Sequence, residues 1–191
     1  MTRDEQVRLL GIGRAAVRNY LAGCVTDPPH VDLSWPDQTL RGVFVTLRRG
    51  DRLRGCIGTF MPNRPLPETV WAMAIAAAED PRFVNQPILL EELSALSIDI
   101  SVLSPLQRTR EPLSLTPGEH GIYIRSAHRS GCFLPEVATE CGWSAQEFLE
   151  RCCTDKADLP ADAWKDPGTE VHLFTVEKLS ESALAAHAAI Q

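Results

Sequence analysis

The residues most able to do chemistry are gathered in the hexapeptide Leu53-Arg54-Gly55-Cys56-Ile57-Gly58. If this stretch is a β-strand, alternate side chains share a face, which places Arg54 and Cys56 on the same side of the sheet. A guanidinium beside a thiol favours the thiolate, which is the nucleophilic form of cysteine. The glycines at 55 and 58 weaken a strand and mark a bulge or the close approach of a ligand or another backbone. The hexapeptide therefore predicts either a reactive cysteine or a small buried cysteine, with Arg54 in an ion pair.

Three ionisable residues outside the hexapeptide are further candidates for a binding site. Asp80 and Arg82 flank a proline directly after a predicted helix, where they either bind a ligand or form an ion pair that ends the helix. Glu136 follows a proline near a predicted turn and is either a binding residue or an exposed loop carboxylate.

In an enzyme built on these residues, Cys56 would act as the nucleophile or as an acid–base group. Arg54 would stabilise the thiolate and bind an anionic part of the substrate, while backbone N–H groups at Gly55 and Gly58 would face an oxyanion. Such a site also needs a base, which the sequence does not single out. The candidates are His120, His172, Asp80 and Glu136.

The pattern around the hexapeptide predicts a β-hairpin followed by a helix. Residues 41–49 and 52–60 are two strand-like runs joined at Gly50 and Asp51. Residues 68–80 are rich in strong helix formers and end at Pro81. Apolar and polar residues alternate over 96–104, which indicates a half-buried antiparallel strand.

The remaining segments complete a mixed fold. Ser144 and Glu147 have the spacing of a capping box at the start of a helix. The other predicted elements are helices over 4–22 and 144–153, strands over 121–126, 132–136 and 169–176, a loop over 24–40, and a short terminal helix or tail over 181–190. Because hairpins and helices do not alternate as regular βαβ units, the pattern favours an α+β fold. No linker divides the chain, so residues 1–191 are expected to form a single domain, with two lobes at most.

Composition excludes several classes of protein. The chain has 191 residues, of which 44% are hydrophobic and 23% charged, so it can bury a core and lacks the composition of a disordered protein. The formal net charge of −6 argues against a protein that coats nucleic acid or an anionic membrane. Without a long apolar stretch or an apolar signal core, a cytoplasmic location is expected.

The cysteines and histidines lack the local spacing of metal sites. Six cysteines contain no C-x-x-C pair, and without a secretion signal they are expected to be reduced thiols. Five histidines occur without the short spacings of a metal motif. The sequence therefore predicts neither a metal nor another cofactor.

The hexapeptide, preceded by the residues GVFVTL, resembles the signature of the AMMECR family, whose bacterial members are called AmmeMemoRadiSam system protein A. The resemblance extends from about residue 5 to residue 177. Its other matching pieces are residues 80–83, 91–105, 118–121, 131, 134–138, 142–143 and 163–164. Glu136 is a departure, because the family commonly has glutamine there.

This resemblance implies an α+β fold with two intimately packed lobes around a mostly antiparallel, barrel-like sheet. It also implies a pathway shared with a Memo-like protein and a radical-SAM protein, without naming a reaction. Two functions follow as hypotheses. The chain is either an enzyme that acts on a small metabolite in a cleft around Cys56, or a non-catalytic module that docks those proteins or delivers their substrate.

Overall fold

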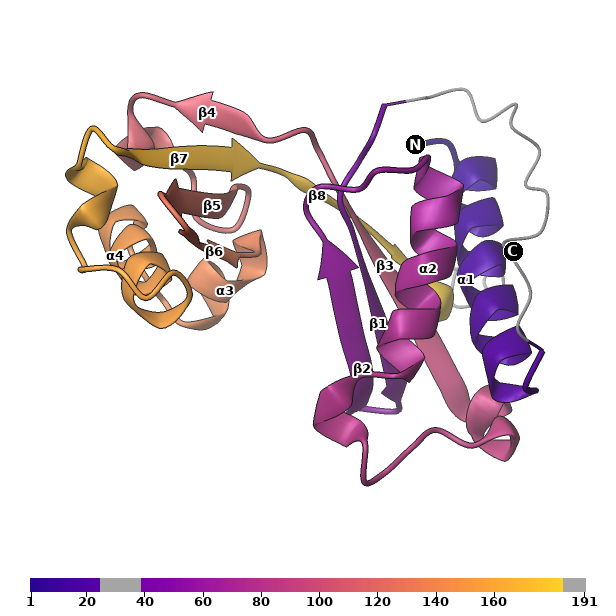
Figure 1. The fold of residues 1–191 in the computed structure, drawn as a ribbon. Coiled ribbons are helices and arrows are strands. Elements are labelled where there is room, and N and C mark those ends of the chain that lie inside the picture. Colours follow the sequence, from indigo (N-terminus) through magenta and orange to yellow (C-terminus); the bar gives the residue numbers. More distant parts are fainter. Residues whose placement is uncertain (25–38, 184–191) are drawn as a thin grey trace. The chain divides into compact units, whose positions relative to one another are not determined.

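The computed structural model of the chain describes residues 1–24 and 39–183, whose helices and strands belong to two units (Figure 1). The first unit comprises Met1–Val102 and Glu177–Gln191, and the second comprises Leu103–Val176. Each unit has its own four-stranded sheet and its own hydrophobic core.

The first unit contains the hairpin predicted around Cys56. Its elements are α1 (Arg3–Leu21), β1 (Val43–Arg49), β2 (Arg52–Thr59), α2 (Leu66–Ala78), the 3₁₀ helices η1 (Pro81–Phe83) and η2 (Leu90–Ala95), β3 (Leu96–Leu103) and β8 (Val176–Ser180). The strand order is β2-β1-β3-β8, and β1 pairs antiparallel with both β2 and β3. Strand β2 is therefore an edge strand of this sheet.

One face of this sheet is covered by the two long helices (Figure 1). Val45 and Leu47 on β1 are fully buried in a core that includes Val17 of α1 and Val70 of α2. Since side chains alternate along a strand, Thr46 projects from the opposite face, where it is half-buried. The helices thus cover one face of the sheet, and Thr46 projects from the other face.

The second unit also combines a four-stranded sheet with two α-helices. They are β4 (Gln107–Thr109), η3 (Pro112–Ser114), β5 (Gly121–Ser126), β6 (Arg129–Phe133), α3 (Pro135–Glu140), α4 (Ala145–Asp155), η4 (Ala163–Lys165) and β7 (Thr169–Phe174). The strand order is β4-β7-β5-β6, and the pairs β4–β7, β5–β7 and β5–β6 are antiparallel. Ile122 and Ile124 of β5 pack in one core with Phe148 of α4.

The fold class predicted from the sequence is confirmed: the chain is α+β with antiparallel sheets. The strands form two separate four-stranded sheets, and neither order closes into a barrel. Helix α1 is present despite two internal glycines, and Ser144 caps α4 through the predicted capping box with Glu147.

Two predicted boundaries are wrong. The segment 132–136 does not continue as a strand, because Pro135 and Glu136 begin α3 and the fixed φ of proline suits the first helical turn. The segment 169–176 does not form one strand either, since β7 ends at Phe174 and β8 begins at Val176. Most of the predicted loop 24–40 and of the predicted helix or tail 181–190 lies outside the described residues. Within the described ranges, no helix combines the length and the apolar character needed to cross a bilayer.

Candidate functional site around Cys56

Cys56 lies on edge strand β2, directly opposite Thr46, which in turn lies opposite Asp99 of β3. All three side chains are half-buried. The hydroxyl oxygen of Thr46 is 3.3 Å from the sulfur of Cys56. The register therefore creates a row of a thiol, a hydroxyl and a carboxylate across three neighbouring strands.

Both backbone polar groups of Cys56 are held by the turn that follows α2. The N–H of Cys56 donates to Asp80 Oδ2 at 2.9 Å, and Arg82 Nη2 donates to the carbonyl oxygen of Cys56 at 3.0 Å. Arg82 also donates to Asp80, through Nη2 to Oδ2 at 2.6 Å and through Nε to Oδ1 at 3.0 Å. We call this arrangement the Asp80–Arg82 clamp; it occupies groups that an edge strand otherwise leaves unpaired.

The clamp fixes the charges of its two members. The hydrogen bond from the Arg82 side chain lowers the pKa of Asp80 to about 2, and N–H groups of Cys56 and Arg82 contribute while burial opposes the shift. The pKa of Arg82 is raised, chiefly by its hydrogen bond to Asp80 and to a smaller extent by the charge of a Cys56 thiolate. Asp80 is therefore an anion at neutral pH. Its proton affinity is too low for a general base that acts near neutral pH.

Arg54 occupies a β-bulge, which the sequence analysis did not anticipate. The β1–β2 register shifts just after Leu47, and Arg54 has no partner residue on β1. Its buried guanidinium donates to the carbonyl oxygens of Gln86 and Pro87, at 3.2 and 3.1 Å, and to the carboxylate of Glu92 at 3.1 Å. Because a bulge interrupts the regular alternation of side chains, sequence spacing alone does not place Arg54 on the same face as Cys56. A role of Arg54 in binding or catalysis stays a prediction.

The two glycines of the hexapeptide are required by contacts within the protein. A Cβ atom on Gly55 would lie 1.9 Å from the carbonyl oxygen of Ala77 in α2. A Cβ atom on Gly58 would lie 2.3 Å from the ring of Phe44. At both positions the expected close approach is made by the chain itself. Whether their N–H groups also face a ligand stays a prediction.

The other candidate residues belong to the second unit. Glu136 is half-buried in the first turn of α3. His120 accepts a hydrogen bond at Nδ1 from the N–H of Thr116 at 3.0 Å. His172 lies on β7, where burial lowers its pKa. Of the four candidate bases, Asp80 alone shares a unit with Cys56.

The six cysteines differ widely in exposure. All are free thiols, with Cys24 and Cys141 exposed, Cys56 and Cys132 intermediate, and Cys152 and Cys153 buried. Burial raises the pKa of Cys132, Cys152 and Cys153. The parts of the chain that the structure describes contain no group of three or more metal-ligating side chains. Thr46 and Asp99 were missed by the sequence analysis, because only the strand register reveals them.

The protein is thus an α+β protein with a partly exposed cysteine on an edge strand. An Asp–Arg clamp holds the backbone of that cysteine. The AMMECR1 family model matches residues 10–179, and the chain belongs to this family. A protein of Thermococcus gammatolerans is 40% identical over 185 residues, which cover 91% of this chain and 88% of that protein. A protein of Methanothermobacter thermautotrophicus is 38% identical and covers 95% of this chain and 96% of its own length.

A solved structure supports the same assignment. The crystal structure of an uncharacterised protein from Pyrococcus horikoshii superimposes with a TM-score of 0.79 at 36% sequence identity. The match covers 93% of this chain and 92% of that one. Family and fold are thus established over nearly the whole chain.

Proposed function

We propose that the chain acts on a small metabolite through the thiol of Cys56. The observation that carries the proposal is the combination of a fixed backbone and a reachable sulfur. The Asp80–Arg82 clamp holds both peptide groups of Cys56, while the side chain stays partly exposed beside the hydroxyl of Thr46. A nucleophile on a rigid strand keeps its position when the substrate arrives, which favours reaction.

The surrounding groups fit a thiolate that adds to a carbonyl carbon: the C–S bond forms as the π electrons of the C=O bond move to the oxygen. After the thiol loses its proton to solvent, the Thr46 hydroxyl can donate a hydrogen bond to the sulfur anion. The Arg82 guanidinium is held by Asp80, yet its side chain is 59% exposed, so it can also meet an anionic part of the substrate. In line with the family resemblance, we place this reaction in a cytoplasmic pathway with a Memo-like and a radical-SAM protein.

Site-resolved alkylation tests the proposal. Iodoacetamide labelling of each cysteine is followed by peptide mass spectrometry as a function of pH. We expect Cys56 to label faster than exposed Cys141, although its sulfur is less accessible. Thr46→Val keeps the side-chain shape but removes the hydroxyl, so labelling of Cys56 should slow by roughly threefold to tenfold. Thr46→Ser keeps the hydroxyl and should preserve the rate.

Cys141 serves as the internal reference in each variant. If Cys56 labels more slowly than Cys141 in the native protein and Thr46→Val leaves its rate unchanged, the thiol has no special reactivity. The catalytic proposal then fails, and the docking function takes precedence.

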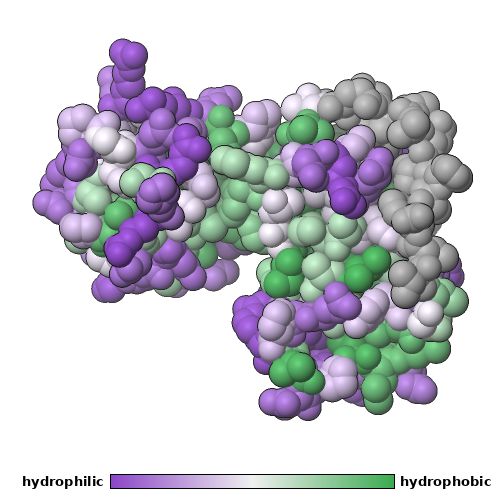
Figure 2. Space-filling view, viewed as in Figure 1, coloured by the Kyte–Doolittle hydropathy of each residue, from purple (hydrophilic) through white to green (hydrophobic). Residues whose placement is uncertain are grey.

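The docking function has one observation in its favour. Val84 and Leu89, in the segment between η1 and η2, and Leu90, the first residue of η2, are exposed at 73%, 57% and 44% of their surface. Figure 2 shows hydrophobic residues gathered at this end of the first unit. Exposed apolar residues close together often mark a protein interface. A purified Memo-like protein is the partner to test: Leu89→Ser should weaken its binding, Val7→Ser on α1 should not, and Cys56→Ser should leave it unchanged.

A further inference from the structure

The second unit contains a pocket of about 490 Å³ beside edge strand β4, and every residue that lines it belongs to that unit. Its lining residues include two arginines, Arg108 and Arg110, and His120. Leu173 and Phe174 supply an apolar part. Most of the other lining residues are polar, and the volume lies within the range of small-molecule sites.

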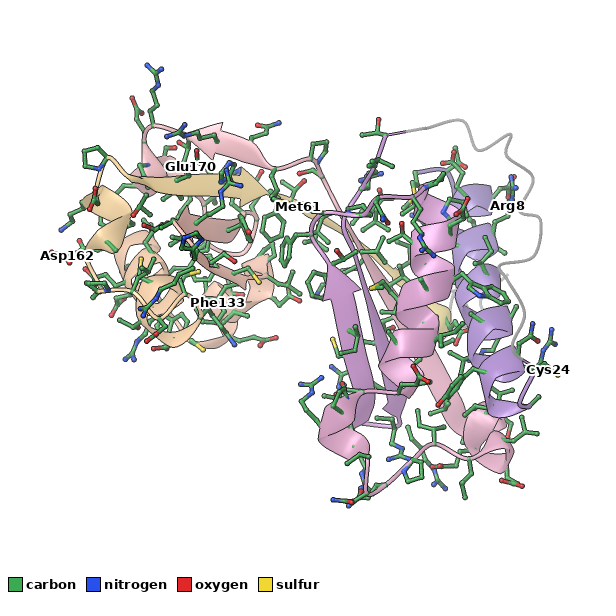
Figure 3. All side chains as sticks on the ribbon, in the orientation of Figure 1. Arg8, Cys24, Met61, Phe133, Asp162 and Glu170 are labelled. Atoms are coloured by element: carbon green, nitrogen blue, oxygen red, sulfur yellow. The ribbon has the colours of Figure 1, made fainter. Side chains whose placement is uncertain are left out.

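The charge balance around β4 leaves positive charge at the pocket. The carboxylate of Glu170, labelled in Figure 3, is shared by two guanidinium groups, with Arg125 Nη2 at 2.6 Å and Arg108 Nη1 at 3.3 Å. One negative charge therefore faces two positive ones. Among the residues that the structure describes, Arg110 forms no ion pair. An incoming anion would thus gain from both Arg108 and Arg110.

His120 contributes a hydrogen-bond donor through the contact made by its other nitrogen. Nδ1 accepts from the backbone N–H of Thr116 at 3.0 Å, so Nδ1 carries a lone pair. In a neutral imidazole the proton is then on Nε2, which becomes a donor. His120, Arg108 and Arg110 all line the same pocket.

We propose that this pocket binds a small organic anion, a carboxylate or a phosphate monoester. Its charged group meets Arg108, Arg110 and the Nε2–H of His120, and its apolar part lies against Leu173 and Phe174. The planar fork of an arginine matches two oxygens of a carboxylate or phosphate, which gives the site its chemical preference. Glu111 also lines the pocket and opposes a second negative charge, so a carboxylate is favoured over the more highly charged phosphate monoester.

Calorimetric titration with three matched probes tests the assignment. The probes are benzoate, phenyl phosphate and uncharged benzamide, each titrated into the full-length protein at low salt. We expect benzoate and phenyl phosphate to bind and benzamide to bind much more weakly. The stronger of the two anions identifies whether the site prefers a carboxylate or a phosphate.

Three variants locate the binding. Arg110→Gln removes a charge from the pocket and should weaken anion binding by about tenfold. His120→Asn keeps an acceptor for Thr116, but its shorter side chain has no donor at the position of Nε2, so binding should weaken several-fold. Arg151→Gln removes an exposed charge from α4, outside the pocket, and should leave the affinity unchanged.

Three results overturn the proposal. They are benzamide binding as tightly as benzoate, Arg110→Gln and Arg151→Gln having equal effects, and the absence of binding by either anion at millimolar concentration. The melting temperature of Arg110→Gln should equal that of the native protein, because the side chain is exposed. A loss of binding is then a loss of contact and not of folding.

Discussion

The N–H of Cys56 donates to the carboxylate of Asp80 at 2.9 Å, and this bond joins edge strand β2 to the turn after α2. The two residues are 24 positions apart in the chain. Asp80 is almost fully buried, and it also accepts from the backbone N–H of Arg82 at 3.0 Å as the cap of η1. One carboxylate thus caps a 3₁₀ helix, orients Arg82 and fixes the strand that carries the thiol.

Replacement of Asp80 by asparagine should destabilise the protein. The amide keeps one acceptor oxygen but loses the charge that Arg82 and two N–H groups contact, so we expect a loss of about 2 kcal/mol in the free energy of unfolding. Urea denaturation measures the change. Asp51→Asn in the exposed β1–β2 turn is the matched control and should change stability by less than about 0.5 kcal/mol. Equal effects of the two variants would show that the clamp contributes nothing.

The same carboxylate predicts a pH dependence of stability. The pKa of Asp80 is lowered from 3.8 to about 2 in the folded protein, so the folded state favours the ionised form. This contribution is fully present above the unfolded pKa and is lost as the pH falls from about 4 to about 2. With allowance for the exposure of Arg82, it amounts to about 1–2 kcal/mol.

The difference in stability between native protein and Asp80→Asn isolates this term from the other acidic groups. Measured by urea denaturation, the difference should shrink over that interval as the pH falls. A difference that stays constant down to about pH 2 would contradict the assignment.

The β-bulge at Arg54 explains why the sequence predicted the fold better than the site. Counted from the turn at Gly50 and Asp51, a regular hairpin places Cys56 opposite Val45, whose side chain faces the core. The bulge adds one residue to β2, so Cys56 lies opposite Thr46 instead. Because a shift of one residue exchanges the two faces of a strand, the bulge decides whether the thiol faces the helices or the other side of the sheet.

Periodicity and helix propensity were sufficient for the larger elements, since these depend on neighbouring residues. The alternation over 96–104 predicted β3, and Pro81 correctly limited α2. The contact between Cys56 and Asp80 was out of reach, because it depends on how the end of α2 lies against β2. Both residues were nevertheless singled out, as members of two separate motifs.

The two arginines that share Glu92 should differ in their contribution to stability. Arg54 and Arg49 donate to the Glu92 carboxylate at the same distance of 3.1 Å. The Arg54 side chain is 6% exposed and also donates to two backbone carbonyl groups, whereas the Arg49 side chain is 58% exposed. Arg54→Met should cost about 2–4 kcal/mol, because buried acceptors lose their donor, and Arg49→Met less than about 1 kcal/mol. Chemical denaturation measures the free energy of unfolding of both variants. Similar losses in the two would show that the burial of Arg54 does not increase its contribution to stability.

The glycines of β2 and α1 give a final prediction with opposite signs. A methyl group on Gly55 would lie 1.9 Å from the carbonyl oxygen of Ala77, so α2 would have to move away from the strand. We expect Gly55→Ala to destabilise the protein by about 3 kcal/mol or more, or to prevent folding. Gly11 lies within α1 and has nothing within 4 Å of an added Cβ atom.

Gly11→Ala should therefore stabilise the protein by about 0.5–1 kcal/mol, through a higher helix propensity and a less flexible unfolded chain. Thermal unfolding measures the change in stability of both variants. Gly11→Ala is the control, because it tests the same substitution where there is space for the methyl group. If the free energy of unfolding of Gly55→Ala lies within about 1 kcal/mol of the native value, then β2 and α2 are not in the close contact on which the position of Cys56 depends. In that case, the rate at which Cys56 is labelled would also be unchanged in Gly55→Ala. We expect instead that a Gly55→Ala protein that still folds has a displaced α2, a weaker Asp80–Arg82 clamp and an altered labelling rate.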